Sequence, residues 1–524
     1  MVRVAGRRCR FRLVALAIAA SASLFLGASA RAADVTVTDE KQVSDRLLEL
    51  TIDTPAFTEP TKVHVFLPTG YDADPARRWP VTYALAGTMN NYNSFANVLG
   101  GEALTAGYPS IIVSPDGNSG YWSDWYKGGA FGPPEYETYV IDQLIPLIDA
   151  RYRTIPDRRH RAVFGISMGG YGSMMVAARH PDLFGAAATI SGAVDSNLTL
   201  LGVALSISST FDGGQIDDIY GPRETQEVRW RGHNPTDLAE NLRGTDLQVR
   251  TANGVLNPAI GEGDSPDDAL SCVVEGGVYQ GSISFHEQLE KLGVDHLWKD
   301  YGNGCHTVEN FQRQVTDTLA GFESFFQAPP PDPKTFDYRS IEPHFRVWGW
   351  DVDVDPRRAL EFLRLKGGDS AVTVEGSGRT SLTTPAWYRG LKTVDVGGVP
   401  VRPRADGRLR FAVDLGPAHT VQQYTSDTEP RFRTKTLKLA PHALLRITVA
   451  RRVRRGARIC LRAIGGSVPR ARIRVGRSGA RLAVGAKARC RTLRLRRPAR
   501  VVTVTGRDAF GHAVKARAAL RRSR

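Results

Sequence analysis

Short apolar runs alternate with longer amphipathic stretches between residues 46 and 326. The apolar runs have the length and β-branched composition of strands, and they occupy residues 47–52, 62–67, 80–85, 110–114, 161–165, 185–191, 247–251 and 297–301. The amphipathic stretches have apolar residues at helical spacing, and they occupy residues 135–152, 168–180, 278–292 and 308–325. This alternation predicts an α/β domain over residues 34–327, with a mostly parallel sheet and helices on both of its faces. Residues 196–245 are polar and irregular, and we expect them to cover a site as a lid.

The pattern changes to short strands after residue 327. Residues 328–339 are rich in proline, which predicts a stiff linker. Residues 340–440 contain short β-branched and aromatic runs between turn residues, so we expect a β-sandwich-like domain with one short helix near residues 356–365. In residues 441–524 arginines alternate with apolar residues along short strands, which predicts a second β-sandwich-like domain.

Charge divides the chain into an acidic body and a basic end. The 524 residues are 42% hydrophobic and 23% charged, which is ordinary for a globular protein and excludes a disordered, collagenous or polytopic membrane protein. The whole chain carries +15, and residues 441–524 carry +24 from 25 Lys and Arg against Asp508, which leaves −9 for residues 1–440. This asymmetry predicts an anionic partner for residues 441–524, such as an envelope polymer, a membrane surface or a nucleic acid. The alternative is that these arginines are the solvated face of a half-buried sheet.

The first 33 residues have the three parts of a signal peptide. Five arginines precede an apolar stretch over residues 13–27, and Ala30-Arg31-Ala32 is a small-x-small cleavage signal. The alternative is a membrane anchor, but the apolar stretch is shorter than the roughly 20 residues that span a bilayer. We therefore expect a secreted or cell-envelope-associated protein with no membrane span after cleavage. Export and the sparse aromatics of residues 441–524 argue against nucleic acid as a partner.

Export also changes how the cysteines are interpreted. Cys9 leaves with the signal, and Cys272, Cys305, Cys460 and Cys490 remain as an even set in an oxidising compartment. Three pairings are possible. Pairing Cys272 with Cys305 and Cys460 with Cys490 keeps each bridge inside one predicted domain, and buried free thiols are the alternative.

A G-x-S-x-G motif lies where a predicted strand meets a predicted helix. Gly165, Ser167 and Gly169 form it, after the strand at residues 161–165 and before the helix that begins at residue 168. This context is the one required for a nucleophile elbow, in which the serine occupies a sharp turn and its neighbours two positions away must be small. The helix N-terminus also favours a developing negative charge. We therefore predict Ser167 as a nucleophile; an incidental serine in a glycine-rich turn is the alternative.

A serine hydroxyl needs a base, and four histidines follow Ser167 within the domain. His286 falls in a helical pattern and His296 at the start of a strand, whereas His306 lies in a glycine-containing loop between a late strand and the last helix. The order nucleophile, acid, histidine is expected for this arrangement, so His306 is the predicted base.

The acid is left open by the residues alone. Asp264, Asp267, Asp268 and Glu275 all lie between the strand at residues 247–251 and the predicted base. Each could orient the imidazole.

Residues 83–325 resemble the antigen 85 mycolyltransferase and esterase D type of α/β-hydrolase. The matching stretches are WSDWY at residues 122–126, GISMG at 165–169, EGGV at 275–278 with Phe285 downstream, and NGCH at 303–306. The resemblance implies an α/β-hydrolase fold and places the orienting carboxylate on Glu275, ahead of a helix that leads to Phe285. It also implies an oxyanion hole made by the N–H groups of Thr88 and Met168. A bridge from Cys272 to Cys305 would fix the acid loop against the base loop.

Other positions bear on the substrate. Trp122, Trp125, Tyr126 and Met89 are candidates to line a substrate site, with loop packing as the alternative for the aromatic residues. Ala86, Met89 and Val308 replace the acidic residue, the Arg and the Trp that help the transferases of the family hold trehalose. This departure favours water as the acyl acceptor.

No metal-ligand cluster, phosphate loop or dinucleotide motif was found, so we expect no metal and no cofactor. The sequence predicts a secreted serine carboxylic ester hydrolase that acts on an ester of a lipid or an acylated small molecule through a Ser-His-Glu triad. One alternative is an acyltransferase that acts on a sugar or lipid hydroxyl. A second is an inactive scaffold that binds the cell envelope.

Overall fold

The computed structural model describes residues 35–127, 134–425 and 431–521, apart from 442, 455, 466, 496–497 and 509–511. The predicted signal peptide lies outside the described residues. Among the described residues, no helix combines the length and apolar character needed to cross a bilayer.

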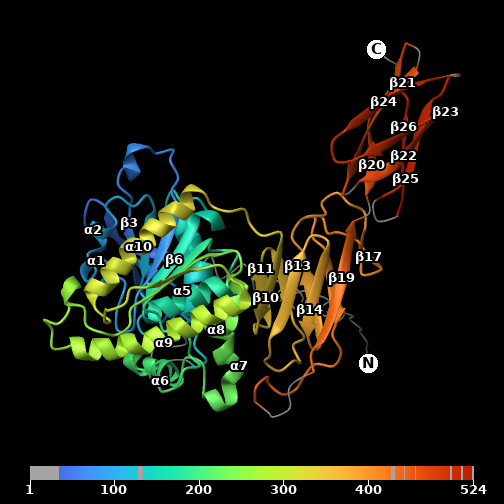
Figure 1. Cartoon of the computed structure of the whole chain (residues 1–524). Helices are drawn as coiled ribbons and strands as arrows, with labels where there is room; N and C mark the ends of the chain where they lie inside the picture. Colours follow the sequence, from blue (N-terminus) through green and yellow to red (C-terminus); the bar gives the residue numbers. More distant parts are fainter. Residues whose placement is uncertain are drawn as a thin grey trace, which may run out of the picture.

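A nine-stranded mixed sheet forms the centre of the first part of the chain (Figure 1). Its strands have the order β1-β2-β3-β5-β4-β6-β7-β8-β9. Their bounds are β1 Thr36–Gln42, β2 Leu47–Asp53, β3 Thr61–Phe66, β4 Val81–Leu85, β5 Ile111–Pro115, β6 Arg161–Ile166, β7 Ala186–Ile190, β8 Asp246–Thr251 and β9 Leu297–Asp300. All pairs among β4 to β9 are parallel, and β1, β2 and β3 add an antiparallel edge beside β5. The predicted mostly parallel sheet is confirmed.

Helices cover both faces of this sheet. The α-helices are α1 Ser94–Asn97, α2 Gly101–Leu104, α3 Tyr136–Thr138, α4 Ile145–Arg151, α5 Met168–Arg179, α6 Thr199–Ser208, α7 Arg223–His233, α8 Pro235–Leu238, α9 Asp268–Leu292 and α10 Val308–Gln327. Short 3-10 turns are η1 Tyr71–Ala73, η3 Arg158–His160, η4 Ser209–Asp212, η5 Ala239–Leu242 and η6 Pro258–Ile260, and η2 Tyr139–Leu144 is a π-helical segment.

Alternate residues of the central strands enter two different cores. In β6, Val163 packs in the core that includes α4, α5 and α9, whereas Ala162 and Phe164 pack in the core that includes α1 and α10. Successive side chains of a strand point to opposite faces, so a strand buried on both sides is apolar at every position. The continuous apolar runs in the sequence follow from this double burial.

The segment 196–245 is helical, which corrects the expectation of an irregular insertion. It contains α6, η4, α7, α8 and η5. Polar residues dominate α7 because only one side of it is buried, through Val228 and Trp230, and this polarity hid the helix in the sequence.

Helix α9 begins at Asp268, ten residues before the predicted start. Glycines are poor helix formers, so Gly276 and Gly277 suggested a helix start. In the structure they lie inside α9, and a Cβ at Gly277 would lie 2.7 Å from a methyl carbon of Leu200. The glycine therefore lets α6 pack closely, and Glu275 lies within the helix rather than ahead of it.

Two pairs of antiparallel sheets follow the α/β part. The first pair has the orders β10-β13-β14-β19-β16-β17 and β11-β12-β15-β18, and the second β20-β21-β24 and β23-β22-β25-β26. The bounds in the first pair are β10 Thr335–Ser340, β11 His344–Val347, β12 Trp350–Asp353, β13 Leu363–Gly368, β14 Ala371–Gly376, β15 Arg379–Thr383, β16 Val394–Val396, β17 Val399–Val401, β18 Arg410–Asp414 and β19 Arg433–Pro441. Those in the second pair are β20 Leu444–Val453, β21 Gly456–Ile464, β22 Val468–Val475, β23 Ser478–Val484, β24 Arg489–Arg494, β25 Val501–Arg507 and β26 Ala513–Ala519. Each pair encloses its own apolar core, as expected for sandwich-like domains.

Two local expectations in this region differ from the structure. The short helix predicted near residues 356–365 is absent from these described residues. Asp355 instead accepts the N–H of Arg357 in a turn, and β13 follows with Leu363 and Leu365 alternating into the core. The range 328–339, predicted as a linker, includes most of β10.

Candidate active site

Ser167 lies in a sharp turn between β6 and α5. Its backbone has φ 57° and ψ −118°, a region that L-residues rarely occupy. A Cβ at Gly165 would lie 2.0 Å from the carbonyl oxygen of Gly169, and a Cβ at Gly169 would lie 2.0 Å from that of Leu85. Both positions therefore require glycine, as the steric argument from the motif predicted.

His306 and Glu275 form a close pair although 31 residues separate them. His306 Nδ1 lies 2.7 Å from Glu275 Oε2. The Glu275 side chain is fully buried, whereas the imidazole is partly exposed. This contact assigns the proton of the neutral ring to Nδ1, because a carboxylate only accepts, and leaves the lone pair of Nε2 free.

The other oxygen of Glu275 is held by two donors from the ends of parallel strands. Oε1 accepts the N–H of Ala252 at 2.9 Å and the Oγ–H of Ser191 at 2.6 Å. Ser191 follows β7, and its Oγ also accepts the amide of Gln314 in α10. These hydrogen bonds compensate the buried carboxylate for its lost hydration.

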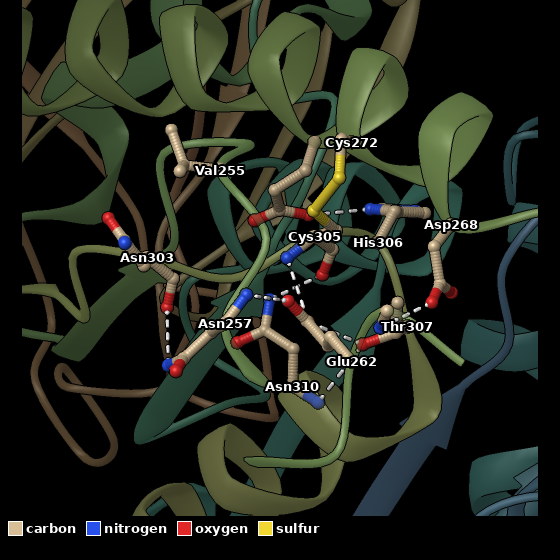
Figure 2. Close-up of a disulfide and its surroundings, with 12 residues drawn as sticks. Val255, Asn257, Glu262, Asp268, Cys272, Asn303, Cys305, His306, Thr307 and Asn310 are labelled. Carbon is tan, nitrogen blue, oxygen red and sulfur yellow. Dashed lines mark hydrogen bonds and ion pairs between the residues drawn. A yellow bond between two sulfur atoms is a disulfide. The ribbon is translucent and has the colours of Figure 1, made fainter. Parts of the chain in front are cut away.

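A disulfide joins the two elements that carry this pair. Cys272 lies one helical turn before Glu275 in α9, and Cys305 immediately precedes His306 (Figure 2). The N–H of His306 also donates to the carbonyl of Ser271 at 3.1 Å. The loop is thus fixed to the helix by a covalent bond and a backbone hydrogen bond. Cys460 and Cys490 form the second disulfide, so both pairings are those predicted.

Glu262 is a buried carboxylate that the sequence did not single out. Its Oε1 accepts the N–H of Cys305 at 2.8 Å and the hydroxyl of Thr307 at 2.7 Å, on both sides of His306 (Figure 2). Its Oε2 accepts the N–H of Asn257. Glu262 therefore holds the histidine loop by three donors, and no local motif could have revealed it.

The three aspartates that competed with Glu275 lie elsewhere. Asp264 is exposed, and Asp267 precedes α9. Asp268 accepts the N–H groups of Gly263 and Ser265, which stabilises the start of α9. None of the three contacts His306 by a hydrogen bond or ion pair among the described residues.

A cavity of about 850 Å³ opens over Ser167 and His306. Its walls come from the loop after β4, from α6, from the first half of α9 and from the start of α10, and they are mostly apolar. Leu200, Leu270 and Val273 lie at its mouth with at least 60% of their surface exposed. Within the described residues Ser167 and His306 share this cavity without a direct hydrogen bond, and such bonds often tighten only when substrate is bound.

The two predicted oxyanion donors lie beside Ser167. Met168 is the first residue of α5, so its N–H has no acceptor within the helix. Thr88 lines the cavity, and a Cβ at Gly87 would lie 3.3 Å from the Cβ of Ser167. The loop after β4 thus passes directly over the serine. Met89 points away with 77% of its surface exposed.

The aromatic candidates are not among the residues that line this cavity. Trp122 is fully buried and donates its indole N–H to the carbonyl of Ala86. Trp125 is buried, and Tyr126 packs under the guanidinium of Arg229. Between the two tryptophans, burial raises the pKa of Asp124 to about 7, and its carboxyl group holds the start of α3. In this structure Trp122 and Trp125 have the positions of loop-packing residues.

Residues 54–322 match the family model described as "Putative esterase". The chain belongs to this family. The sheet, its covering helices and the turn at Ser167 together form an α/β-hydrolase fold.

Members of the esterase family and its neighbours cover only the first part of the chain. Esterase Rv1288 of Mycobacterium tuberculosis (strain ATCC 25618 / H37Rv) is 31% identical over 268 residues, which are 50% of this chain and 56% of that protein. The diacylglycerol acyltransferase/mycolyltransferase Ag85B of Mycolicibacterium smegmatis is 28% identical over 230 residues, 43% of this chain and 66% of that protein. The crystal structure of Mycobacterium tuberculosis MPT51 (FbpC1) is 21% identical, covers 53% of this chain and 97% of its own, and gives a TM-score of 0.43. The chain spans about half the length of the first of these relatives.

Proposed function

We propose that this protein is a secreted serine carboxylic ester hydrolase that works through an acyl-enzyme. The observation that carries the proposal is the buried Glu275–His306 pair in the wall of the cavity that contains Ser167. A carboxylate that orients an imidazole beside a serine at a nucleophile elbow is the arrangement that activates a serine hydroxyl.

In the first half of the reaction, Ser167 Oγ attacks the carbonyl carbon of the ester. Its proton passes to His306 Nε2, and the N–H groups of Thr88 and Met168 stabilise the oxyanion of the tetrahedral intermediate. Collapse of the intermediate breaks the ester C–O bond. The alcohol leaves with the proton returned by the imidazolium, whose charge Glu275 stabilises.

In the second half, water attacks the acyl-Ser167 ester. His306 takes a proton from the water and returns it to Ser167 as the carboxylic acid leaves. The apolar walls of the cavity suit an acyl chain or another apolar group, so an ester of a lipid or an acylated small molecule is the proposed substrate.

Hydrolysis of p-nitrophenyl esters of graded chain length tests the proposal. Wild-type protein should release p-nitrophenol, and Ser167→Ala should lower kcat by at least about 10⁴-fold because the nucleophile is lost. Ser173→Ala, a buried serine of the same helix that hydrogen-bonds Ala188, controls for general disturbance of α5. Equal turnover by wild type and Ser167→Ala would exclude the proposed mechanism. If neither protein turns over these esters, transfer and envelope-binding assays address the two alternatives.

Transfer to an alcohol is the second candidate reaction, because the acyl-enzyme is the same up to the attack by water. Ag85B carries acyltransferase in its name, and a 28% identical stretch links it to this chain. Product analysis with added glycerol or trehalose distinguishes the two reactions. Acyl glycerol or acyl trehalose in excess over free acid would favour transfer.

We further propose export to the medium or the cell envelope. The signal-like residues 1–33 support it, as do two disulfides, since oxidising compartments retain such bonds. Sequencing the N-terminus of protein recovered from medium and from envelope should find a chain that starts after Ala32 or Ala33.

Residues 441–524 are proposed as a separate basic domain that binds an anionic envelope polymer. On the sheet β23-β22-β25-β26, Arg481, Arg472, Thr505 and Lys515 are successive cross-strand partners and form one exposed row. Arg474, Thr503 and Arg517 form the next row. Like charges placed side by side destabilise a sheet, and Asp508 is the sole acid in this part of the sequence.

Binding of the full chain to immobilised linear polyphosphate tests this partner. The affinity should fall steeply with added salt, because exposed charges are screened. Replacing Arg472, Arg474 and Arg517 with Glu should weaken binding by at least about 10-fold. Salt-independent binding, or unchanged binding by the triple variant, would leave these arginines as a solvated face.

A further inference from the structure

Two histidines and a glutamate meet at the far end of α9, away from the cavity. His286 and Glu290 lie one turn apart on α9, and His296 lies in the connection from α9 to β9. One ligand atom from each of the three side chains lies within 4.8 Å of the other two. The proposed reaction uses none of these groups, and a spacing of four and then six residues matched no metal motif in the sequence.

The backbone prepares one of these rings as a ligand. His296 Nδ1 lies 2.8 Å from the carbonyl oxygen of Val294 and donates its proton to it. The neutral ring is therefore protonated at Nδ1, and the lone pair of Nε2 points at His286. Histidines that bind metals commonly have this arrangement, in which a carbonyl oxygen accepts the second ring N–H and fixes the tautomer and the ring orientation.

The other two groups complete a set of donors with one sign of purpose. His286 Nδ1 lies 2.7 Å from His296 Nε2, and the His286 ring stacks on Trp298 of β9 with 4.5 Å between ring centroids. Glu290 Oε1 lies 4.0 Å from His296 Nε2. The His296 side chain is almost fully buried, whereas Glu290 is open to solvent, so an ion could enter from the Glu290 side.

We propose that His286, Glu290 and His296 bind a divalent transition metal of the zinc class. Two imidazole nitrogens and one carboxylate oxygen are a normal ligand set for Zn²⁺, with water as the fourth ligand. Two nitrogens on a tetrahedral zinc lie about 3.4 Å apart, so the rings separate by less than an ångström when the ion replaces the hydrogen bond between them. The bound ion would join the end of α9 to the edge strand β9.

Zinc titration of protein without a histidine tag, freed of metal by chelation, tests this site. Calorimetry with ZnCl₂ should detect a site that is lost or weakened at least about 10-fold in His296→Gln and in His286→Gln. MgCl₂ should not bind there, because Mg²⁺ prefers oxygen ligands. ZnCl₂ should also raise the unfolding temperature of wild type more than that of His296→Gln, since a ligand that binds the folded state stabilises it.

His344→Gln is the matched control, because His344 is an exposed histidine paired with Asp353 in another sheet. It should bind zinc as wild type does. The proposal is overturned if wild type shows no saturable zinc binding below about 1 mM. It is equally overturned if zinc binding is the same in wild type, His286→Gln and His296→Gln. Circular dichroism of each variant separates loss of the site from loss of folding.

Discussion

Cys272 and Cys305 join the helix that carries Glu275 to the residue that precedes His306. The bond acts together with Glu262, whose carboxylate holds Cys305 and Thr307 on either side of the histidine. The proposed base is therefore positioned from three directions, by its own carboxylate partner, by a covalent bridge and by a second buried carboxylate. Each of these contacts gives a separate expectation.

Glu275→Gln should lower kcat for ester hydrolysis by about 10³- to 10⁴-fold. The amide cannot stabilise the imidazolium, and its NH₂ group competes for the wrong tautomer of His306. Steady-state kinetics beside Asp264→Asn, which changes an exposed acid near the same helix, measures the effect. A comparable loss in Asp264→Asn, with Glu275→Gln active, would move the acid to the aspartate loop.

Glu262→Gln should lower kcat by about 10- to 100-fold through misplacement of His306, with little change in KM for a short ester. Glu262 only accepts hydrogen bonds, and a glutamine would turn a donor toward one of its three donors. The control is Glu361→Gln, since Glu361 is a buried carboxylate that accepts bonds from Ser377 and His419 in a different sheet. If the two variants lose stability and activity in parallel, Glu262 has no positioning role beyond folding.

Replacing Cys272 and Cys305 with Ala should destabilise the protein by roughly 2–4 kcal/mol and reduce esterase activity as the loop loosens from α9. Denaturant unfolding and ester hydrolysis measure the two effects. The double variant Cys460→Ala, Cys490→Ala is matched in chemistry and lies in the basic part of the chain. It should leave ester hydrolysis at the wild-type rate, and a drop equal to that of the first pair would contradict the assigned role.

His233 should make the protein less stable in acid. Burial lowers the pKa of its imidazole to about 4, and the ring stacks on Tyr220 while Nδ1 donates to the carbonyl of Arg229. The unfolded chain binds the proton at higher pH than the folded one, so stability is full above about pH 6.5 and falls as the pH decreases toward 4, by roughly 3 kcal/mol.

Denaturant unfolding of wild type and His233→Gln at several pH values checks this expectation. The difference in free energy of unfolding between the two proteins should shrink as the pH falls from 7 to 4. His344→Gln, which removes an exposed histidine, should run parallel to wild type. A constant difference between wild type and His233→Gln would show that His233 does not titrate in this range.

The local chemistry of Ser167 was predictable because the constraint acts over a few residues. Gly165 and Gly169 are forced by contacts with the turn and with the strand directly beneath it. The strands were predictable for a related reason, since burial on both faces makes every position apolar. His306 followed from its place between the last strand and the last helix.

The acid and its supports were decided by the tertiary structure. Glu275 could be selected over three aspartates only through resemblance to a family, and the sequence placed it ahead of α9 rather than within it. Ser191 and Glu262 gave no signal at all, because their donors and acceptors come from segments far apart in the chain. A local pattern records steric and periodic constraints between neighbours. Hydrogen bonds to a buried carboxylate depend on where separate strands, loops and helices end in space, and only the packing of the whole sheet and its helices determines that.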